Sequence, residues 1–128
     1  MTKNLQFCQI PLFLQQINEG MKILVLTGND ACCGPMAAAF LRDYAPSNEV
    51  VSAGRDPSET IEPMVVAVMK ECLVDLSGYV PRDAKNVQAS EYDVVYECPE
   101  MSCENTVDAY RALRDFIKNE SYLFFRKL

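Results

Sequence analysis

Apolar runs of strand length alternate with helically spaced apolar positions from residue 21 onward. The β-branched runs predict strands over 22–27, 49–52 and 93–96. Apolar side chains at helical spacing predict helices over 35–44, about 60–72, and from about 105 toward the end of the chain. Strands that alternate with helices form parallel sheets with right-handed crossovers. The pattern therefore predicts an α/β fold, a three-layer αβα arrangement around a small parallel sheet.

The first 20 residues differ from the rest and are interpreted as an N-terminal extension of a domain formed by residues 21–128. Within the extension, residues 5–10 have the pattern of a strand, and residues 11–17 that of a short helix that ends at Gly20. A short helical turn is also expected at 86–90, before the third strand.

The turn after the first predicted strand is the first candidate site. Turn-forming residues lead to Pro35, which is favoured in the first turn of a helix because it has no N–H to leave unpaired. A loop that ends at a helix N-terminus can hold an anion with its unpaired N–H groups and the helix dipole. The predicted anion loop consists of Thr27, Gly28, Asn29, Asp30, Ala31, Cys32, Cys33 and Gly34.

Composition and charge exclude several classes of function. The chain has 128 residues, a length typical of one domain, and a net charge of −6 without a run of basic residues, which makes nucleic-acid or membrane-surface binding unlikely to be its role. No apolar run is long enough for a signal peptide or a membrane span, so a cytoplasmic protein is expected. The sequence contains no histidine, which excludes Ser-His-Asp and Cys-His catalysis.

Six cysteines are expected to be reduced thiols, since nothing in the sequence directs export. Cys32 and Cys33 lie where a helix N-terminus lowers a thiol's pKa, which would make them reactive. The favoured alternative is that they pack as small apolar side chains. Cys98 and Cys103, close together in a loop, are a better disulfide candidate. These four cysteines have no standard zinc spacing, so neither a metal nor a cofactor is expected.

Three segments resemble the low-molecular-weight protein tyrosine phosphatases and their relatives, the thioredoxin-coupled arsenate reductases. KILVLTGND-ACCGPMAAAF resembles the family's phosphate loop, commonly V-C-T-G-N-S-C-R-S-P-M-A-E-A. The segment 50–79 resembles its second strand, S-A-G turn and D-(I/L)-S-G-(H/Y) motif. YDVVYECPEMSC is similar to the strand that carries redox cysteines in the arsenate reductases. The resemblance covers about residues 21–120.

The departures from the family pattern concern the chemistry. The resemblance implies a nucleophilic cysteine at the first loop position, which the alignment assigns to Leu26. It implies an arginine that clamps the phosphoryl oxygens, and Cys33 stands there. Asp30 is an extra residue, and a carboxylate about 4 Å from a phosphate costs roughly 1–4 kcal/mol. The general-acid D-P loop and the strand before it are missing between Cys103 and the last helix.

The missing segment predicts an open sheet edge. The resemblance implies the strand order 2-1-3-4, so loss of the fourth strand would leave 93–96 unprotected. Residues 5–10 are interpreted as a cover for this edge, in the same chain or in a swapped homodimer. The alternative is that residues 1–20 are a leader before Met21.

Two functions remain open from the sequence. The first is a catalytically degenerate binding or regulatory module, with a small anion or a protein as partner. The second is a thiol-redox or arsenate-reductase-like protein that uses Cys32 or Cys33 with Cys98 and Cys103. An active phosphatase with a relocated nucleophile requires Cys-x5-Arg, and no cysteine has arginine six positions later.

Overall fold

The computed structural model describes residues 20–128 and contains a three-stranded parallel sheet. The strands are β1 (Lys22–Thr27), β2 (Glu49–Gly54) and β3 (Val94–Glu97), in the order β2-β1-β3. Leu24 of the central strand pairs with Val51 on one side and Val95 on the other. The predicted α/β class and parallel sheet are confirmed, with β2 two residues longer at its end than predicted.

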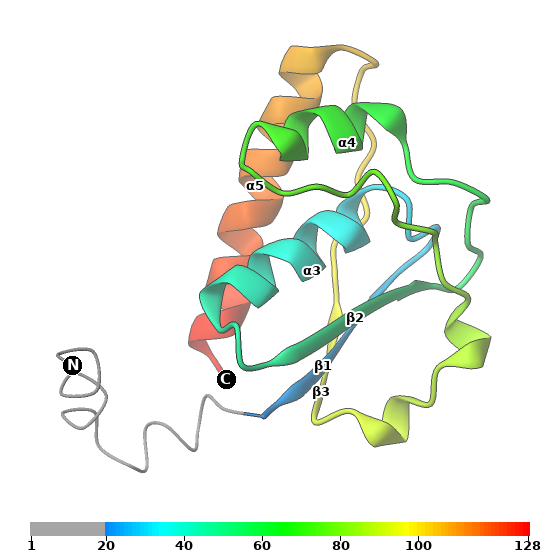
Figure 1. Ribbon diagram of the computed structural model, residues 1–128, viewed down its shortest axis with the longest axis vertical. Helices are drawn as coiled ribbons and strands as arrows, with labels where there is room; N and C mark the ends of the chain where they lie inside the picture. The colour runs from blue at the N-terminus through cyan, green and yellow to red at the C-terminus, as the bar shows by residue number, and fades with distance from the viewer. Residues whose placement is uncertain (1–19) are drawn as a thin grey trace, which may run out of the picture.

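One face of the sheet is covered by two helices that lie side by side, α3 (Cys33–Tyr44) and α5 (Val107–Arg126) (Figure 1). Ile23 and Val25 of β1 belong to the same buried cluster as Met36 of α3 and Ile117 of α5. Alternate residues of a strand point to opposite faces, so these side chains define the core between sheet and helices. The turn between β1 and α3 is thus flanked by a strand and a helix that share one buried core.

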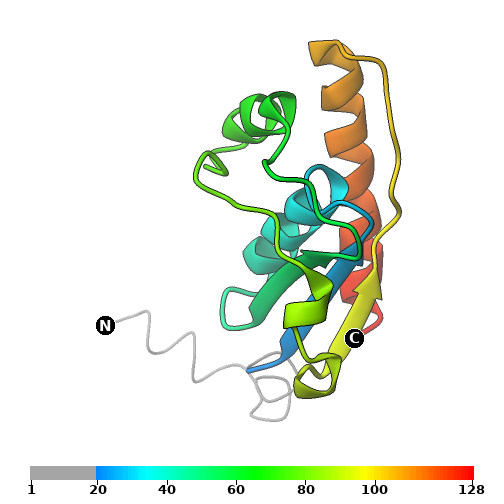
Figure 2. The ribbon, with the colours of Figure 1, turned by 90° about the vertical axis from the view of Figure 1, so that its right-hand side faces the viewer.

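The other face of the sheet is covered by an irregular segment rather than by a long helix (Figure 2). This segment contains two single-turn 3-10 helices, η1 (Ala84–Asn86) and η2 (Ala89–Glu91), in place of the single turn predicted. It is joined to β2 by a parallel bridge between Gly54 and Asp83. The third layer of the fold is therefore thin, and Val95 of β3 remains 39% exposed.

The helix after β2, α4 (Pro63–Lys70), is shorter than the predicted 60–72. Its end has the hydrogen bonds of a Schellman motif, from the Leu73 N–H to the Lys70 carbonyl and from the Val74 N–H to the Met69 carbonyl. Leu73 has the left-handed φ of 64° that this motif requires, and its side chain is 95% exposed. The apolar spacing continues past Lys70, but the chain has already turned.

Replacing Leu73 with glycine is expected to stabilise the protein by about 0.5–1 kcal/mol. A Cβ is unfavourable at positive φ, and the exposed leucine side chain offers no packing in return. Urea denaturation measures the free energy of unfolding. Leu73→Ala is the matched control because it removes the side chain but keeps the Cβ. If Leu73→Ala raised the free energy of unfolding as much as Leu73→Gly, strain from the Cβ at positive φ could not be the cause.

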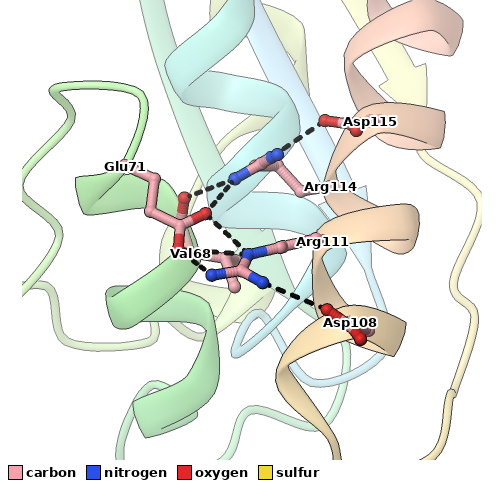
Figure 3. A network of polar contacts seen from close by, with 6 residues as sticks. All are labelled: Val68, Glu71, Asp108, Arg111, Arg114 and Asp115. Atoms are coloured by element: carbon pink, nitrogen blue, oxygen red, sulfur yellow. Dashed lines mark hydrogen bonds and ion pairs between the residues drawn. The ribbon is translucent and has the colours of Figure 1, made fainter.

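Helices α4 and α5 are joined by a network of ion pairs (Figure 3). The Glu71 carboxylate accepts from Arg111 at 2.7 Å and from Arg114 at 2.8 Å, which lowers the pKa of Glu71 to about 2. Arg114 also donates to the carbonyl oxygen of Val68 at 2.9 Å, near the C-terminus of α4. A cation at a helix C-terminus interacts favourably with the helix dipole. The network thus connects the C-terminal end of α4 to α5.

The expected loss of a fourth strand agrees with the described part of the chain, where β3 leads to α5 through residues 98–106 without a strand between them. Among residues 20–128, β3 pairs only with β1 and lies at the edge of the sheet. The expectation that residues 5–10 cover this edge falls outside the described residues. No helix within residues 20–128 is long and apolar enough to cross a membrane.

Candidate anion loop and thiol cluster

The loop between β1 and α3 is held by backbone hydrogen bonds from two neighbouring segments. On one side, N–H groups of the chain after β2 donate to successive loop carbonyl oxygens. These bonds run from Arg55 to Thr27, from Asp56 to Gly28, from Ser58 to Asn29 and from Glu62 to Ala31. On the other side, the Cys98 N–H donates to the Leu26 carbonyl at 3.0 Å. Because all three parallel strands end at this edge, their loops meet there.

Thr27, rather than Leu26, has its side chain inside the loop. Its hydroxyl oxygen accepts the Asp30 N–H at 3.2 Å, and the residue is 2% exposed. A Cβ on Gly34 would lie 2.8 Å from this oxygen, so the start of α3 approaches Thr27 closely. The structure therefore places the side chain of Thr27, and not that of Leu26, against the start of α3 inside the loop.

Asp30 anchors the loop from within. It has a left-handed φ of 52° and no exposed surface. Its Oδ2 accepts hydrogen bonds from the Tyr79 hydroxyl and, at 2.8 Å, from the Arg82 N–H, whereas its Oδ1 has no partner among the described residues. Burial raises the pKa of this carboxyl group. Asp30 thus anchors the loop through its Oδ2, while its Oδ1 lies beside Gly34 at the start of α3.

Glu100 is the carboxylate that reaches the loop. It comes from the segment between β3 and α5, and it accepts a hydrogen bond from the Gly28 N–H. A Cβ on Gly28 would lie 2.8 Å from the second carboxylate oxygen, so glycine permits this close approach. Nothing in the spacing of the sequence predicted this contact, because it depends on how residues 98–106 fold back over the loop.

No arginine clamps the loop in the described structure. Cys33 begins α3 at the place where the resemblance implies the arginine. Arg55 forms an ion pair with Glu97, and the Arg82 guanidinium donates to the Ser52 carbonyl at 3.3 Å. The bidentate contact that a guanidinium makes with a phosphoryl group therefore has no donor on this loop.

The four candidate thiols meet at this edge, and all are free. The Cys33 sulfur accepts the Met101 N–H at 3.5 Å, and the Cys98 thiol donates to the Cys33 carbonyl at 3.7 Å. A hydrogen bond from Cys32 is the main cause that lowers the pKa of Cys33, and the same bond raises the pKa of Cys32. Burial raises the pKa of Cys98 and of Cys103. Cys33 is thus the thiol most disposed to ionise.

A cavity of about 280 Å³ opens between the loop and residues 100–103. Its lining residues are Asn29, Cys32, Glu62, Glu100, Met101, Ser102, Cys103, Tyr110 and Leu113. The lining includes two carboxylates and no basic side chain. The Tyr110 hydroxyl donates to Glu62, which raises the pKa of Tyr110. This electrostatic environment opposes a dianionic substrate.

No metal centre is built at this edge. Within residues 20–128, no three side chains of the ligating types (histidine, cysteine, aspartate or glutamate) lie in positions that could hold a metal ion. The sequence placed Thr27 in the loop without a role for its side chain, and it gave no signal for Glu100 as a group that contacts the loop. It also missed Tyr79, although the S-G-(H/Y) motif pointed to that position and its hydroxyl joins Asp30 to the Ser52 hydroxyl at 2.6 Å.

Comparison with solved structures shows the same fold. An arsenate reductase in the phosphate binding state is 21% identical, with a TM-score of 0.71 over 84% of this chain and 98% of that one. The tyrosine phosphatase AmsI of Erwinia amylovora is 16% identical, with a TM-score of 0.71 over 84% of this chain and 92% of that one. The tyrosine phosphatase Wzb from Escherichia coli K30, in complex with sulphate, is 17% identical, with a TM-score of 0.69 over 83% and 96%.

Sequence comparison gives the family. The glutaredoxin arsenate reductase of Synechocystis sp. is 27% identical over 74 residues, which are 58% of this chain and 56% of that relative's length. The family described as low molecular weight phosphotyrosine protein phosphatase matches residues 22–122. That match spans most of the chain and includes every strand and helix of the described fold except the last turn of α5. The chain therefore belongs to the low molecular weight phosphotyrosine protein phosphatase family.

Proposed function

We propose that this chain is a non-catalytic member of its family, a binding or regulatory module that does not transfer phosphoryl groups. The observation that carries the proposal is the Glu100 carboxylate on the Gly28 N–H, in a loop without an arginine. Phosphoryl transfer depends on positioning and on positive charge around the transferred group. Here the group that accepts the Gly28 N–H is the carboxylate of Glu100, which brings negative charge to the loop.

The Thr27 side chain, which lies inside the loop, supports the same conclusion. The Thr27 hydroxyl is buried and accepts a hydrogen bond from the Asp30 N–H. A hydroxyl needs an adjacent general base to become a nucleophile, and the chain has no histidine. Burial raises the pKa of the nearby Asp30 carboxyl group, which favours its protonated form, and a protonated carboxyl group is not a base. A threonine in this setting holds the loop and does not attack phosphorus.

Turnover assays test the proposal directly. The protein is incubated with p-nitrophenyl phosphate between pH 5 and 8, and separately with arsenate in the presence of reduced glutaredoxin or thioredoxin. The expected result is no product above that of heat-denatured protein. Turnover that disappears in Cys32→Ser or Cys33→Ser would overturn the proposal and identify the thiol responsible.

A second candidate function is thiol–disulfide exchange, because the Met101 N–H and the Cys32 thiol both stabilise a thiolate at Cys33. On this view the Cys33 thiolate would attack a disulfide of a partner protein, form a mixed disulfide with it and release one partner thiol. Cys98 or Cys103 would then attack the mixed disulfide, which releases the second partner thiol and leaves an intramolecular disulfide. Attack requires access as well as ionisation. Cys33 is 1% exposed, whereas Cys103 is only partly buried, and this favours the non-catalytic proposal.

Alkylation at pH 7, followed residue by residue with mass spectrometry, distinguishes the two candidates. The non-catalytic proposal predicts that Cys103 and Cys72 react slowly, and that Cys32, Cys33 and Cys98, which are the buried cysteines among residues 20–128, react only after denaturation. Their burial is the physical reason. Rapid labelling of Cys33 in the folded protein would instead support the exchange function.

A further inference from the structure

We propose that Glu100 is an intramolecular occupant of the anion loop, which excludes external oxyanions while residues 98–106 cover the loop. The inference rests on the proposed function and adds how access to the same site is controlled. Its basis is a specific contact. The carboxylate accepts the Gly28 N–H, and both of its oxygens lie against the Gly28 backbone.

The loop itself retains features of an anion site. The first N–H groups of α3 have no acceptor within the helix, and they point toward the helix N-terminus. No acidic side chain lies in the first turn of α3 to satisfy them, and Cys32 provides no capping side-chain hydrogen bond. Of the other carboxylates close to the loop, Asp30 bonds inward through its Oδ2 to Tyr79 and Arg82, and Glu62 accepts from the Tyr110 hydroxyl. Glu100 therefore supplies the negative charge at the loop's outer side.

The contact between Glu100 and the Gly28 N–H can open, because few other groups hold the Glu100 side chain. The residue is exposed, and the structure records no ion pair for it. It belongs to a segment without regular secondary structure, which ends where α5 begins at Val107. The sulfur of Cys33 accepts the Met101 N–H next to it, so this contact and that of Glu100 hold the segment on the loop together.

Removal of the Glu100 charge is expected to open the site. A phosphate and the Glu100 carboxylate cannot both accept the Gly28 N–H, and two anions in contact with the same backbone group repel each other. We expect Glu100→Gln to bind inorganic phosphate about tenfold more tightly than the unmodified protein, or better still. Glu104→Gln is the matched control, because Glu104 is an exposed carboxylate of the same segment whose side chain does not contact the loop.

An amide NMR titration with inorganic phosphate, at constant ionic strength, measures the affinity and reports on the Gly28 N–H itself. The expected result is a phosphate-dependent shift of the Gly28 amide in Glu100→Gln that is weak in the unmodified protein and in Glu104→Gln. Equal affinities in all three proteins, or an equal gain in both variants, would overturn the inference. Phosphate binding by any of these proteins would not show phosphoryl transfer. The proposed function is therefore tested separately, by the turnover assays.

Discussion

Asp30→Ala is expected to be about 2–4 kcal/mol less stable than Asp30→Asn. Alanine leaves the Arg82 N–H without its acceptor and takes one partner from the Tyr79 hydroxyl, and each partly buried hydrogen bond lost in this way costs roughly 1–3 kcal/mol. The left-handed φ of 52° adds to the difference, because asparagine tolerates it better than alanine. Urea denaturation at pH 7 measures both free energies of unfolding.

The same site gives a pH dependence with a definite sign. Burial raises the pKa of folded Asp30 above its ordinary value of 3.8, so the folded state favours the protonated form. The resulting stabilisation is complete below about pH 3.8 and is lost as the pH rises through the raised pKa. Relative to Asp30→Asn, the unmodified protein should lose stability as pH rises, by at most about 1.4 kcal/mol per pH unit.

Asp56→Asn provides the control for both experiments, because Asp56 lies in the segment after β2 that hydrogen-bonds to the same loop, but it is exposed. It should change the free energy of unfolding by less than about 0.5 kcal/mol. An Asp30→Ala protein as stable as Asp30→Asn would show that the loop does not depend on this buried carboxyl. A stability difference that grows in favour of Asp30 with rising pH would show that the pKa is lowered instead.

Ile117→Ala should have an effect of similar size, about 3–4 kcal/mol of unfolding free energy. The Ile117 side chain has no exposed surface and lies in the core between α5, α3 and the sheet. Its neighbour Phe116 is 41% exposed, so Phe116→Ala is a matched control with an expected loss below about 1 kcal/mol. If denaturation showed equal losses of unfolding free energy in Ile117→Ala and Phe116→Ala, the assignment of Ile117 to the buried face of α5 would be contradicted.

The strands and helices were largely predictable, because a buried face requires apolar residues at a regular spacing along the sequence. The apolar run of β1 and the four-residue spacing of Leu113 and Ile117 identified the central strand and the buried face of α5. The end of α4 was not predictable, since Val74 keeps the apolar spacing while Leu73 already turns the chain. The irregular third layer has no period and gave only a weak signal.

The site was predictable in part. Residue types and a family resemblance located the loop and brought four cysteines to one edge, because parallel strands present their carboxyl ends together. They could not show which side chain near the end of β1 lies inside the loop, which in the structure is that of Thr27. They also could not show that Glu100, 72 residues from Gly28 in sequence, folds onto its N–H.

The central claim is that the fold of the family remains here without a group that attacks phosphorus. Rapid acid quench of the protein with a radiolabelled aryl phosphate, followed by peptide mapping, tests it most directly. The account predicts no covalent phosphate on Thr27 or on any cysteine. A phosphocysteine that forms during the reaction and is lost in Cys32→Ser or Cys33→Ser would contradict it.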